Sequence, residues 1–339
     1  MTDQRSLVLD LIFGRWRSQI LYAGVKVGVF DALANKTKAA SLVAQDLGLD
    51  PGLTYRLLRA LACLGVLNED ANHQFSLTHA GEFLRADHPE TLRGVTLLEE
   101  CPEHYALWKH LPQMIRDGKQ NAFIREFGQM AFDYADRNPE YAQVFDQAMS
   151  SYSGTEAAWV LEALAGHDFS RITHLCDVGG GRGHLLCSFL AKHGHLMGTV
   201  MERAEVIQDQ ASLWADKMNV ADRCSYRAGD MFREVPTADA YLMKHIIHDW
   251  NDEESVQILS NLYRAAAPNA KLFVAEYVVP DPATPHFAKL FDIHMMCWGT
   301  GRERTSAEYA ALLEQAGWKY LDTWFPASKA LGVVEGLKE

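Results

Sequence analysis

Residues 175–183 read LCDVGGGRG, an apolar run with one acidic residue that passes into glycines. The apolar part, over 173–178, is typical of a buried strand, and residues 183–192 have the apolar spacing of a helix. Glycines at such a turn permit a tight backbone and bring N–H groups close to a ligand at the helix N-terminus. The stretch therefore predicts a nucleotide-type ligand where a strand passes into a helix.

Two kinds of ligand compete for this loop. A dinucleotide fold needs a small residue at the sixth position of G-x-G-x-x-G, and counting from Gly179 that position is the bulky His184. The pattern fits better as an acid, Asp177, followed by the alternate glycines Gly179, Gly181 and Gly183. An acid at the end of a strand can bind a cationic amino group. S-adenosylmethionine (SAM) carries such a group together with a carboxylate and a ribose.

Two further acids follow predicted strands. Glu202 ends the strand over 198–202, 25 residues after Asp177, where its carboxylate can accept both ribose hydroxyls. Asp230 follows the strand over 224–228 and is positioned for the adenine amino group. The carboxyl ends of parallel strands meet at one edge of a sheet, so these acids and the loop together favour SAM. The glycine turn alone would be structural about as often as functional.

Strands and helices alternate through the second half of the chain. Beyond those named above, we expect strands over 238–246, 272–277, 319–325 and 331–336, and helices over 205–217, 252–266 and 306–316. Repeated strand–helix units imply a mainly parallel sheet covered on both faces. The predicted fold class is α/β, with a Rossmann-like SAM-binding domain over residues 161–339 and a helical domain over residues 1–160.

Within the helical half, residues 31–85 have a winged-helix layout. A helix over 38–47 precedes Asp50-Pro51, an N-cap followed by a first-turn proline, and the second helix ends near Gly65. An acidic turn over 68–72 then separates two short strands. The bases and acids of 31–85 give 5 − 6 = −1, whereas a DNA-reading wing would be basic. The layout favours dimerisation or a substrate lid over a DNA-binding regulator.

The composition of the chain also argues against nucleic acid binding and predicts the kind of compartment. The net charge is 32 − 44 = −12, which makes nucleic acid an unlikely partner, because binding to phosphates depends on Lys and Arg. The six cysteines form no C-x-x-C pair, and residues 1–30 lack the layout of a signal peptide. No run of about eighteen uncharged apolar residues predicts a membrane span. We expect a reduced, cytoplasmic protein.

The chain resembles the SAM-dependent O-methyltransferases of the plant caffeate and bacterial secondary-metabolite type over nearly its whole length. The segments that carry the resemblance are the winged-helix region, FDQAMS over 145–150, the glycine loop, LMKHIIHDW over 242–250, VAE over 274–276 and GRERT over 301–305. The resemblance implies SAM as cofactor and a homodimer formed through N-terminal helices. It also implies His248 as general base, oriented by Glu276 and Glu303.

The proposed base suits the chemistry. A phenol has a pKa of about 10, so little of it is ionised at neutral pH, while a histidine with a pKa of about 6.5 can accept its proton. A carboxylate on the far ring nitrogen fixes the tautomer. Alternatively, His248 merely ends a strand. His245, His248 and Asp249 also suggest a metal site. However, a spacing of three residues in a strand-to-loop segment should point the two histidine rings to opposite sides, so we expect no metal.

The resemblance implies further site residues. Ser153 matches a hydroxyl that contacts the SAM carboxylate, and Met231, Lys244 and Trp250 match residues around the adenine. The acceptor pocket is implied to include Phe145, Met149, Asp292, Met295 and Trp298. Trp250 can equally be a core aromatic, and a stripe of residues on a helix over 286–298 can equally face the core.

Some positions depart from the family pattern. At the second strand, Met201-Glu202-Arg203-Ala204 replaces Asp-Leu-Pro, so the ribose carboxylate is one methylene longer, and His245 replaces a common tryptophan. The segment GRWRS over 14–18 and the Glu-Arg pair resemble phenazine methyltransferases, which implies a planar polycyclic acceptor. Relatives that bind SAM but hydroxylate or decarboxylate tend to lack the base. The sequence leaves open the acceptor, its regiochemistry, and whether oxygen or nitrogen is methylated.

Overall fold

The computed structural model describes residues 4–339. The chain divides into two compact units. One runs up to Ala106 and includes Ala135–Tyr152, and the other contains Leu107–Tyr134 and Ser153–Glu339. Within the described residues, no helix combines the length and apolar character that a membrane crossing requires.

The first unit contains the winged helix. Its helices are α1 (Gln4–Ile12), α2 (Gly14–Lys26), α3 (Val29–Ala32), α4 (Ala40–Leu47), α5 (Pro51–Cys63), α6 (His79–Glu82) and α7 (Arg93–Glu99), and α8 (Pro102–Leu107) follows at its boundary. Strands β1 (Lys38–Ala39), β2 (Leu67–Glu69) and β3 (Gln74–Leu77) pair antiparallel in the order β1-β3-β2. Asp50 caps α5, accepting from the Leu53 N–H at 2.7 Å, as expected. The helix expected from residue 38 begins at Ala40, because Lys38 and Ala39 pair with β3.

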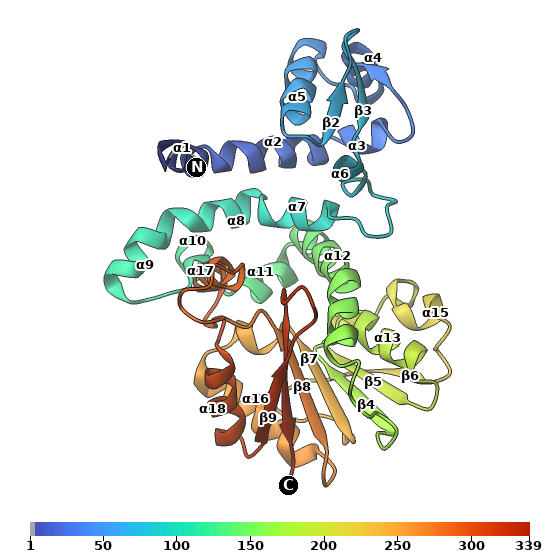
Figure 1. Cartoon of the computed structure of the whole chain (residues 1–339), viewed down its shortest axis with the longest axis vertical. Coiled ribbons are helices and arrows are strands. Elements are labelled where there is room, and N and C mark those ends of the chain that lie inside the picture. Colours follow the sequence, from blue (N-terminus) through green and yellow to red (C-terminus); the bar gives the residue numbers. More distant parts are fainter. Residues whose placement is uncertain (1–3) are drawn as a thin grey trace. The chain divides into compact units, whose positions relative to one another are not determined.

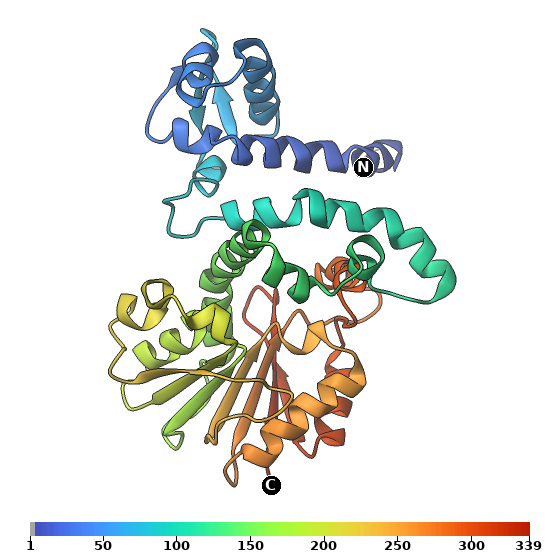
Figure 2. The same ribbon diagram turned by 180° about the vertical axis from the view of Figure 1, so that it is seen from behind.

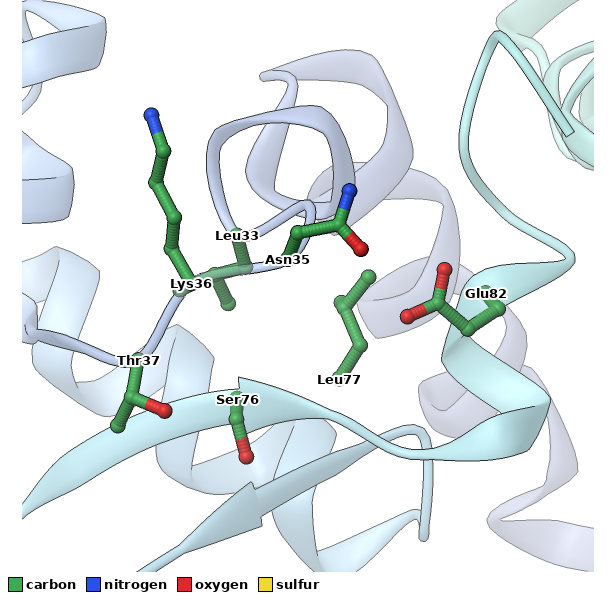
Figure 3. Close-up of a pocket in the computed structure, with 7 residues that line it drawn as sticks. All are labelled: Leu33, Asn35, Lys36, Thr37, Ser76, Leu77 and Glu82. Atoms are coloured by element: carbon green, nitrogen blue, oxygen red, sulfur yellow. The ribbon is translucent and has the colours of Figure 1, made fainter.

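A small pocket lies beside this sheet, between the loop after α3 and the strand β3 (Figure 3). Its volume is about 230 Å³. It is lined by Leu33, Asn35, Lys36, Thr37, Ser76, Leu77 and Glu82. The lining contains no aromatic ring, so this pocket lacks the flat apolar surface that an aromatic guest would need.

The second unit is built on a sheet with the strand order β6-β5-β4-β7-β8-β10-β9. Its strands are β4 (His174–Val178), β5 (Met197–Glu202), β6 (Cys224–Ala228), β7 (Ala240–Lys244), β8 (Lys271–Glu276), β9 (Lys319–Trp324) and β10 (Gly332–Leu337). Strands β4 to β8 pair parallel, and β10 runs antiparallel to both of its neighbours. The predicted mainly parallel sheet is confirmed. The strand expected over 238–246 ends at Lys244, because His245 turns out of the extended conformation with φ 54°.

Helices cover both faces of this sheet (Figure 1). On β7, Tyr241 and Met243 pack in the cluster that contains α16 (Asp252–Ala265) and α18 (Ser306–Gln315). Ala240 and Leu242 face the opposite cluster, with α13 (His184–Lys192) and the end of α12 (Pro139–Ala163). Figure 2 shows the sheet from behind, with the orange helix α16 beside the strands. Both faces are therefore buried, as the continuous apolar strands require.

The second unit contains further helices. They are η1 (Trp108–His110), α9 (Leu111–Asp117), α10 (Ala122–Phe127), α14 (Ala204–Ile207), η2 (Gln210–Ser212), α15 (Trp214–Lys217), η3 (Ile247–Asp249) and α17 (Ala288–Trp298), and α11 (Ala131–Arg137) spans the boundary between the units. The single helix expected over 205–217 is wrong. Asp209 and Leu213 adopt extended conformations, and the Trp214 N–H donates to the Arg182 carbonyl in the glycine loop at 3.1 Å. This tertiary contact overrides the local helical pattern.

The strand order places the glycine loop at a switch point. Strand β4 is the first strand of this sheet in chain order. The chain continues from it to β5 and β6 on one side and then returns to β7 on the other side. In open α/β sheets, ligands bind at the carboxyl ends of the strands where the order reverses. The carboxyl ends of β4 and β7 are followed by the segments 179–183 and 245–250, so both motifs meet at this edge.

The loop after α17 packs against the turn that follows β7. A Cβ atom at Gly301 would collide with the His248 carbonyl oxygen and with backbone atoms of Asp249 and Trp250. We expect Gly301→Ala to destabilise the protein by about 1–3 kcal/mol, because one backbone must move away from the other. Thermal unfolding should show a lower midpoint. Gly299→Ala is the matched control, since its Cβ would make only ordinary contact, 3.5 Å from the Asp249 carbonyl oxygen, and an equal loss in both variants would contradict the argument.

Candidate functional site

The glycine loop adopts backbone conformations that side chains rarely allow. Gly179, Gly181 and Gly183 have φ values of 71°, 57° and 87°. A Cβ at Gly179 would also collide with the side chain of Ile246, in the turn that follows β7. Glycine at these positions lets the loop lie close to that turn and leaves its edge open to a ligand.

Asp177, at the end of β4, is buried beneath this loop. Its exposed fraction is 1%, and its Oδ2 atom has no hydrogen-bond partner among residues 4–339. Burial raises the pKa of Asp177 to about 7; the charge of Glu202 adds to the rise and Lys244 opposes it. A buried carboxylate oxygen without a donor is costly, and a cationic amino group would satisfy it. The residues present therefore fit the ammonium of SAM.

The other predicted cofactor residues lie around the same edge. Glu202, at the end of β5, accepts from the Gly181 N–H at 2.9 Å and from the Arg203 N–H at 2.7 Å, so the loop and the predicted ribose carboxylate are in contact. Asp230 is exposed; it accepts from the Phe232 N–H at 2.9 Å.

Residues predicted to surround the adenine have mixed environments. Trp250 packs edge-on against Phe232 at 4.7 Å, and its buried Nε1 has no hydrogen-bond partner in the described part of the chain. Met231 is half-buried and packs against the sheet core. Lys244, at the end of β7, instead forms an ion pair with Glu156 at 2.7 Å. Ser153 is half-buried on α12.

His248 lies in the short helix η3 with its ring buried against two carboxylates. Its Nδ1 is 2.7 Å from Glu303 Oε1 and 3.5 Å from Glu276 Oε2. Glu276 ends β8, and its Oε1 accepts from the backbone N–H groups of Ile246 and Ile247 at 3.1 and 2.9 Å. The structure therefore brings together the predicted base and both predicted carboxylates, on the Nδ1 side of the ring.

These carboxylates govern the protonation of His248. Burial alone would lower the pKa of His248, but the charges of Glu276, Glu303 and Asp249 outweigh it and raise the pKa to about 10. Asp249 Oδ1 lies 3.7 Å from the other ring nitrogen, Nε2, and burial raises the pKa of Asp249 to about 6. The surrounding carboxylates thus favour the protonated form of His248.

Arg304 holds the turn that carries His248, a role that the sequence reasoning missed. Its fully buried guanidinium donates to the carbonyls of Ile247 at 3.1 Å and Trp250 at 2.8 Å, and pairs with Asp252 at 2.8 Å. Its position in the GRERT motif, next to Glu303, was the available signal. Arg304 therefore links the carboxylate loop to both ends of the η3 turn.

The expectation that His245 and His248 point to opposite sides is wrong. Their rings are stacked, with centroids 5.0 Å apart and an interplanar angle of 24°. The left-handed backbone at His245 turns its side chain back over His248. Ligand atoms of His245, His248 and Glu276 lie within 4.8 Å of one another, so the geometric argument against a metal fails. Hydrogen bonds to carboxylates already engage these nitrogens.

Helix α17 supplies aromatic rings beside the predicted base. The Phe291 ring lies 5.9 Å from the His248 ring, and His294 stacks on Phe291 at 5.1 Å. The sequence reasoning missed both residues, although aromatic side chains recur at helical spacing from Phe287 to Trp298. The periodicity of this helix was the signal for them.

The residues implied for the acceptor pocket are distributed differently. Asp292 Oδ1 accepts from the Glu303 N–H at 2.9 Å, so this carboxylate supports the backbone beside the base. Met295 and Trp298 are buried, with exposed fractions of 2% and 6%. Phe145 and Met149 lie on the part of α12 that belongs to the first unit.

A hollow on the second unit lies at the wrong edge of the sheet for this chemistry. Its lining includes His174, Met197 and Cys224, where β4, β5 and β6 begin. Ligands of such sheets bind at the carboxyl ends of the strands, where the glycine loop and His248 lie.

Family models match both parts of the chain. The O-methyltransferase domain matches residues 108–319, and the O-methyltransferase dimerisation domain matches residues 9–87. The chain belongs to the O-methyltransferase family. A phenazine O-methyltransferase, PhzM, from Lysobacter antibioticus is 32% identical over 97% of this chain and 95% of the relative. An 8-amino-8-demethylriboflavin N,N-dimethyltransferase from Streptomyces davaonensis is 31% identical over 93% of this chain and 90% of the relative.

Solved methyltransferase structures match the whole chain. The crystal structure of LaPhzM has a TM-score of 0.93 at 31% identity, and that of CalO1, a methyltransferase in calicheamicin biosynthesis, has 0.82 at 30% identity. Both matches cover 100% of each chain. CalO1 was solved with S-adenosylhomocysteine bound. This chain is a SAM-dependent methyltransferase of the secondary-metabolite type; SAM is the methyl donor and S-adenosylhomocysteine the product.

Proposed function

We propose that this methyltransferase methylates a hydroxyl group of a small planar aromatic metabolite, phenolic or N-hydroxylated, with His248 as the general base. The observation that carries the proposal is the buried contact of His248 Nδ1 with Glu303, backed by Glu276. Carboxylates on one ring nitrogen favour a proton there and leave Nε2 to accept the proton of the acceptor hydroxyl. The phenazine O-methyltransferase relative supports a planar, polycyclic acceptor.

The proposed cofactor residues follow from the same edge of the sheet. SAM supplies an electrophilic methyl group on a sulfonium. Asp177 would bind its ammonium, the loop at Gly179 and Gly181 would lie against its backbone part, and Glu202 would bind the ribose hydroxyls. Asp230, Met231, Lys244, Trp250 and Ser153 complete the proposed cofactor site.

The base and the acceptor are matched in proton affinity. A phenol has a pKa of about 10, close to the value of about 10 for His248, so the proton can pass between them at little cost. At neutral pH one proton must leave the pair before methyl transfer, from His248 or from the acceptor. The deprotonated oxygen then attacks the methyl carbon, and the imidazolium is stabilised by Glu303 and Glu276.

The acceptor would bind beside α17. The stacked rings of Phe291 and His294 lie near His248, and aromatic rings of this kind suit a planar aromatic guest. Asp292, Met295 and Trp298 are proposed to complete the pocket, with Asp292 also holding the backbone of Glu303.

We also propose a homodimer formed through the N-terminal helices. Large apolar side chains on α1 and α2 are exposed, including Leu11 at 73%, Ile12 at 60% and Trp16 at 56%. Residues from 9 onward match the family's dimerisation domain. Several large exposed apolar side chains on two consecutive helices are typical of a protein interface.

Replacement of the base tests the proposed function. His248→Asn should lower kcat by about 10²–10⁴ with SAM and a panel of phenols and hydroxyphenazines, because the acceptor proton loses its base. SAM binding by calorimetry should stay close to that of the wild type. His195→Asn is the matched control, since the Nε2–H of His195 donates to the Phe169 carbonyl at 3.0 Å and His195 is not among the proposed site residues. A loss of less than about tenfold in His248→Asn would reject the proposed base.

Removing one carboxylate should shift the pH dependence. The Glu303 charge raises the pKa of His248, so Glu303→Gln should lower that pKa and move the acidic limb of kcat/KM to lower pH. The plateau rate should fall as well, because the ring loses its orienting acceptor. The measurement is a kcat/KM profile between about pH 6 and about pH 10, which covers the ordinary pKa values of a histidine and of a phenol. Glu314→Gln, exposed on α18, is the control; a limb that moves to higher pH in Glu303→Gln would contradict this assignment.

Asp177→Asn should separate stability from cofactor binding. The raised pKa means that the folded protein keeps a proton which the unfolded chain releases, so wild-type stability falls as pH rises from the ordinary value near 4 towards 7. The variant should therefore unfold at a higher temperature than wild type above pH 7, and the difference should vanish near pH 4. Its SAM affinity should fall about 10–100-fold by calorimetry. Asp216→Asn, an exposed control, should change neither; unchanged SAM affinity in Asp177→Asn would reject the ammonium contact.

A further inference from the structure

His245 is held in a strained conformation against the proposed base. Its φ of 54° lies in the left-handed region, which is unfavourable for a residue with a side chain. In return, its ring stacks on the His248 ring at 5.0 Å. A strained residue in contact with a reactive group points to a role in the site rather than in packing alone.

Both ring nitrogens of His245 face carboxylates. Nε2 is 2.9 Å from Glu156 Oε1, and Nδ1 is 3.3 Å from Glu276 Oε2. A neutral imidazole has one N–H and one lone pair, so one contact would place a lone pair against a carboxylate oxygen. Only the imidazolium donates at both nitrogens. The contact geometry therefore favours a protonated His245.

The charged groups around His245 come from several elements. They are Glu156 on α12, Lys244 on β7, Glu276 on β8, His248 and Asp249 in η3, and Glu303 in the loop after α17. Glu156 also accepts from the Tyr277 hydroxyl at 2.7 Å. Burial would lower the pKa of His245 and Lys244 acts in the same sense, but the charge of Glu156 and its hydrogen bond raise the pKa overall. The environment thus stabilises the cation.

The shared contact is Glu276 Oε2, which lies 3.3 Å from His245 Nδ1 and 3.5 Å from His248 Nδ1. Building on the proposed role of His248, we propose that His245 is a positioning residue whose fixed positive charge makes His248 easier to deprotonate. The cation offsets part of the charge that Glu276 presents to His248 and repels a second proton on the stacked ring. Without it, Glu276 and Glu303 would hold the proton of His248 more tightly, and less free base would exist at neutral pH.

His245→Asn tests this proposal, because asparagine tolerates a positive φ and carries no charge. The titration of His248, followed by NMR of ligand-free protein labelled in its histidines, should move to higher pH by about one unit, the low end for a charge within ~4–6 Å. The acidic limb of the kcat/KM profile should move by the same amount. At pH 7 kcat/KM should therefore fall about tenfold, while the plateau at high pH is retained. An unchanged or lowered midpoint, or an equal loss at every pH, would overturn the proposal.

Tyr277→Phe is the matched control. It removes one neutral donor from Glu156 and no charge, so the His248 midpoint should stay in place; a shift as large as that of His245→Asn would also overturn the proposal. Nitrogen chemical shifts of the wild-type protein provide a test that needs no variant, since they should show both His245 nitrogens protonated at neutral pH. The NMR readout remains decisive even if His248→Asn is active, because it measures the coupling of the two rings and not catalysis.

Discussion

Burial of opposite charges in one place is the constraint on which the site depends. Glu156, Glu276 and Glu303 meet the imidazoles of His245 and His248 at the carboxyl ends of β7 and β8, and the three carboxylates are at most 3% exposed. Desolvating such groups is expensive unless each has a partner at short range. Removal of any one member would leave a buried charge uncompensated. The positions of these elements are therefore fixed by charge pairing as much as by apolar packing.

The cofactor side of the same edge shows the opposite condition. Asp177 is as buried as the carboxylates near the base, but its Oδ2 has no partner within the described chain. Lys244 connects the two regions, because it forms an ion pair with Glu156 and its charge opposes the rise in the pKa of Asp177. One half of the edge is thus internally neutralised, and the other half is left to be neutralised by a ligand. Strained or unsatisfied groups of this kind are typical of functional sites.

The sequence was sufficient where the signal is local. Apolar strands, the glycine run and acids at strand ends predicted the sheet and the placement of Asp177 and Glu202. His248, Glu276 and Glu303 came from the family motifs. Tertiary contacts explain what was missed. The break in 205–217 depends on a bond from Trp214 to the glycine loop, and the partner of His245, Glu156, lies 89 residues away along the chain.

Helix α17 connects the proposed acceptor site to this charge network. Phe291 and His294 have their rings near His248, while Asp292, the residue after Phe291, accepts from the backbone N–H of Glu303. Consecutive residues of a helix point about 100° apart, so the two tasks occupy different faces. With the acceptor bound as proposed, changes on the aromatic face would alter which planar molecule fits without disturbing Glu303. A change at Asp292 would act on the proposed base through Glu303, so the helix separates the proposed choice of acceptor from the proposed chemistry only if that carboxylate stays in place.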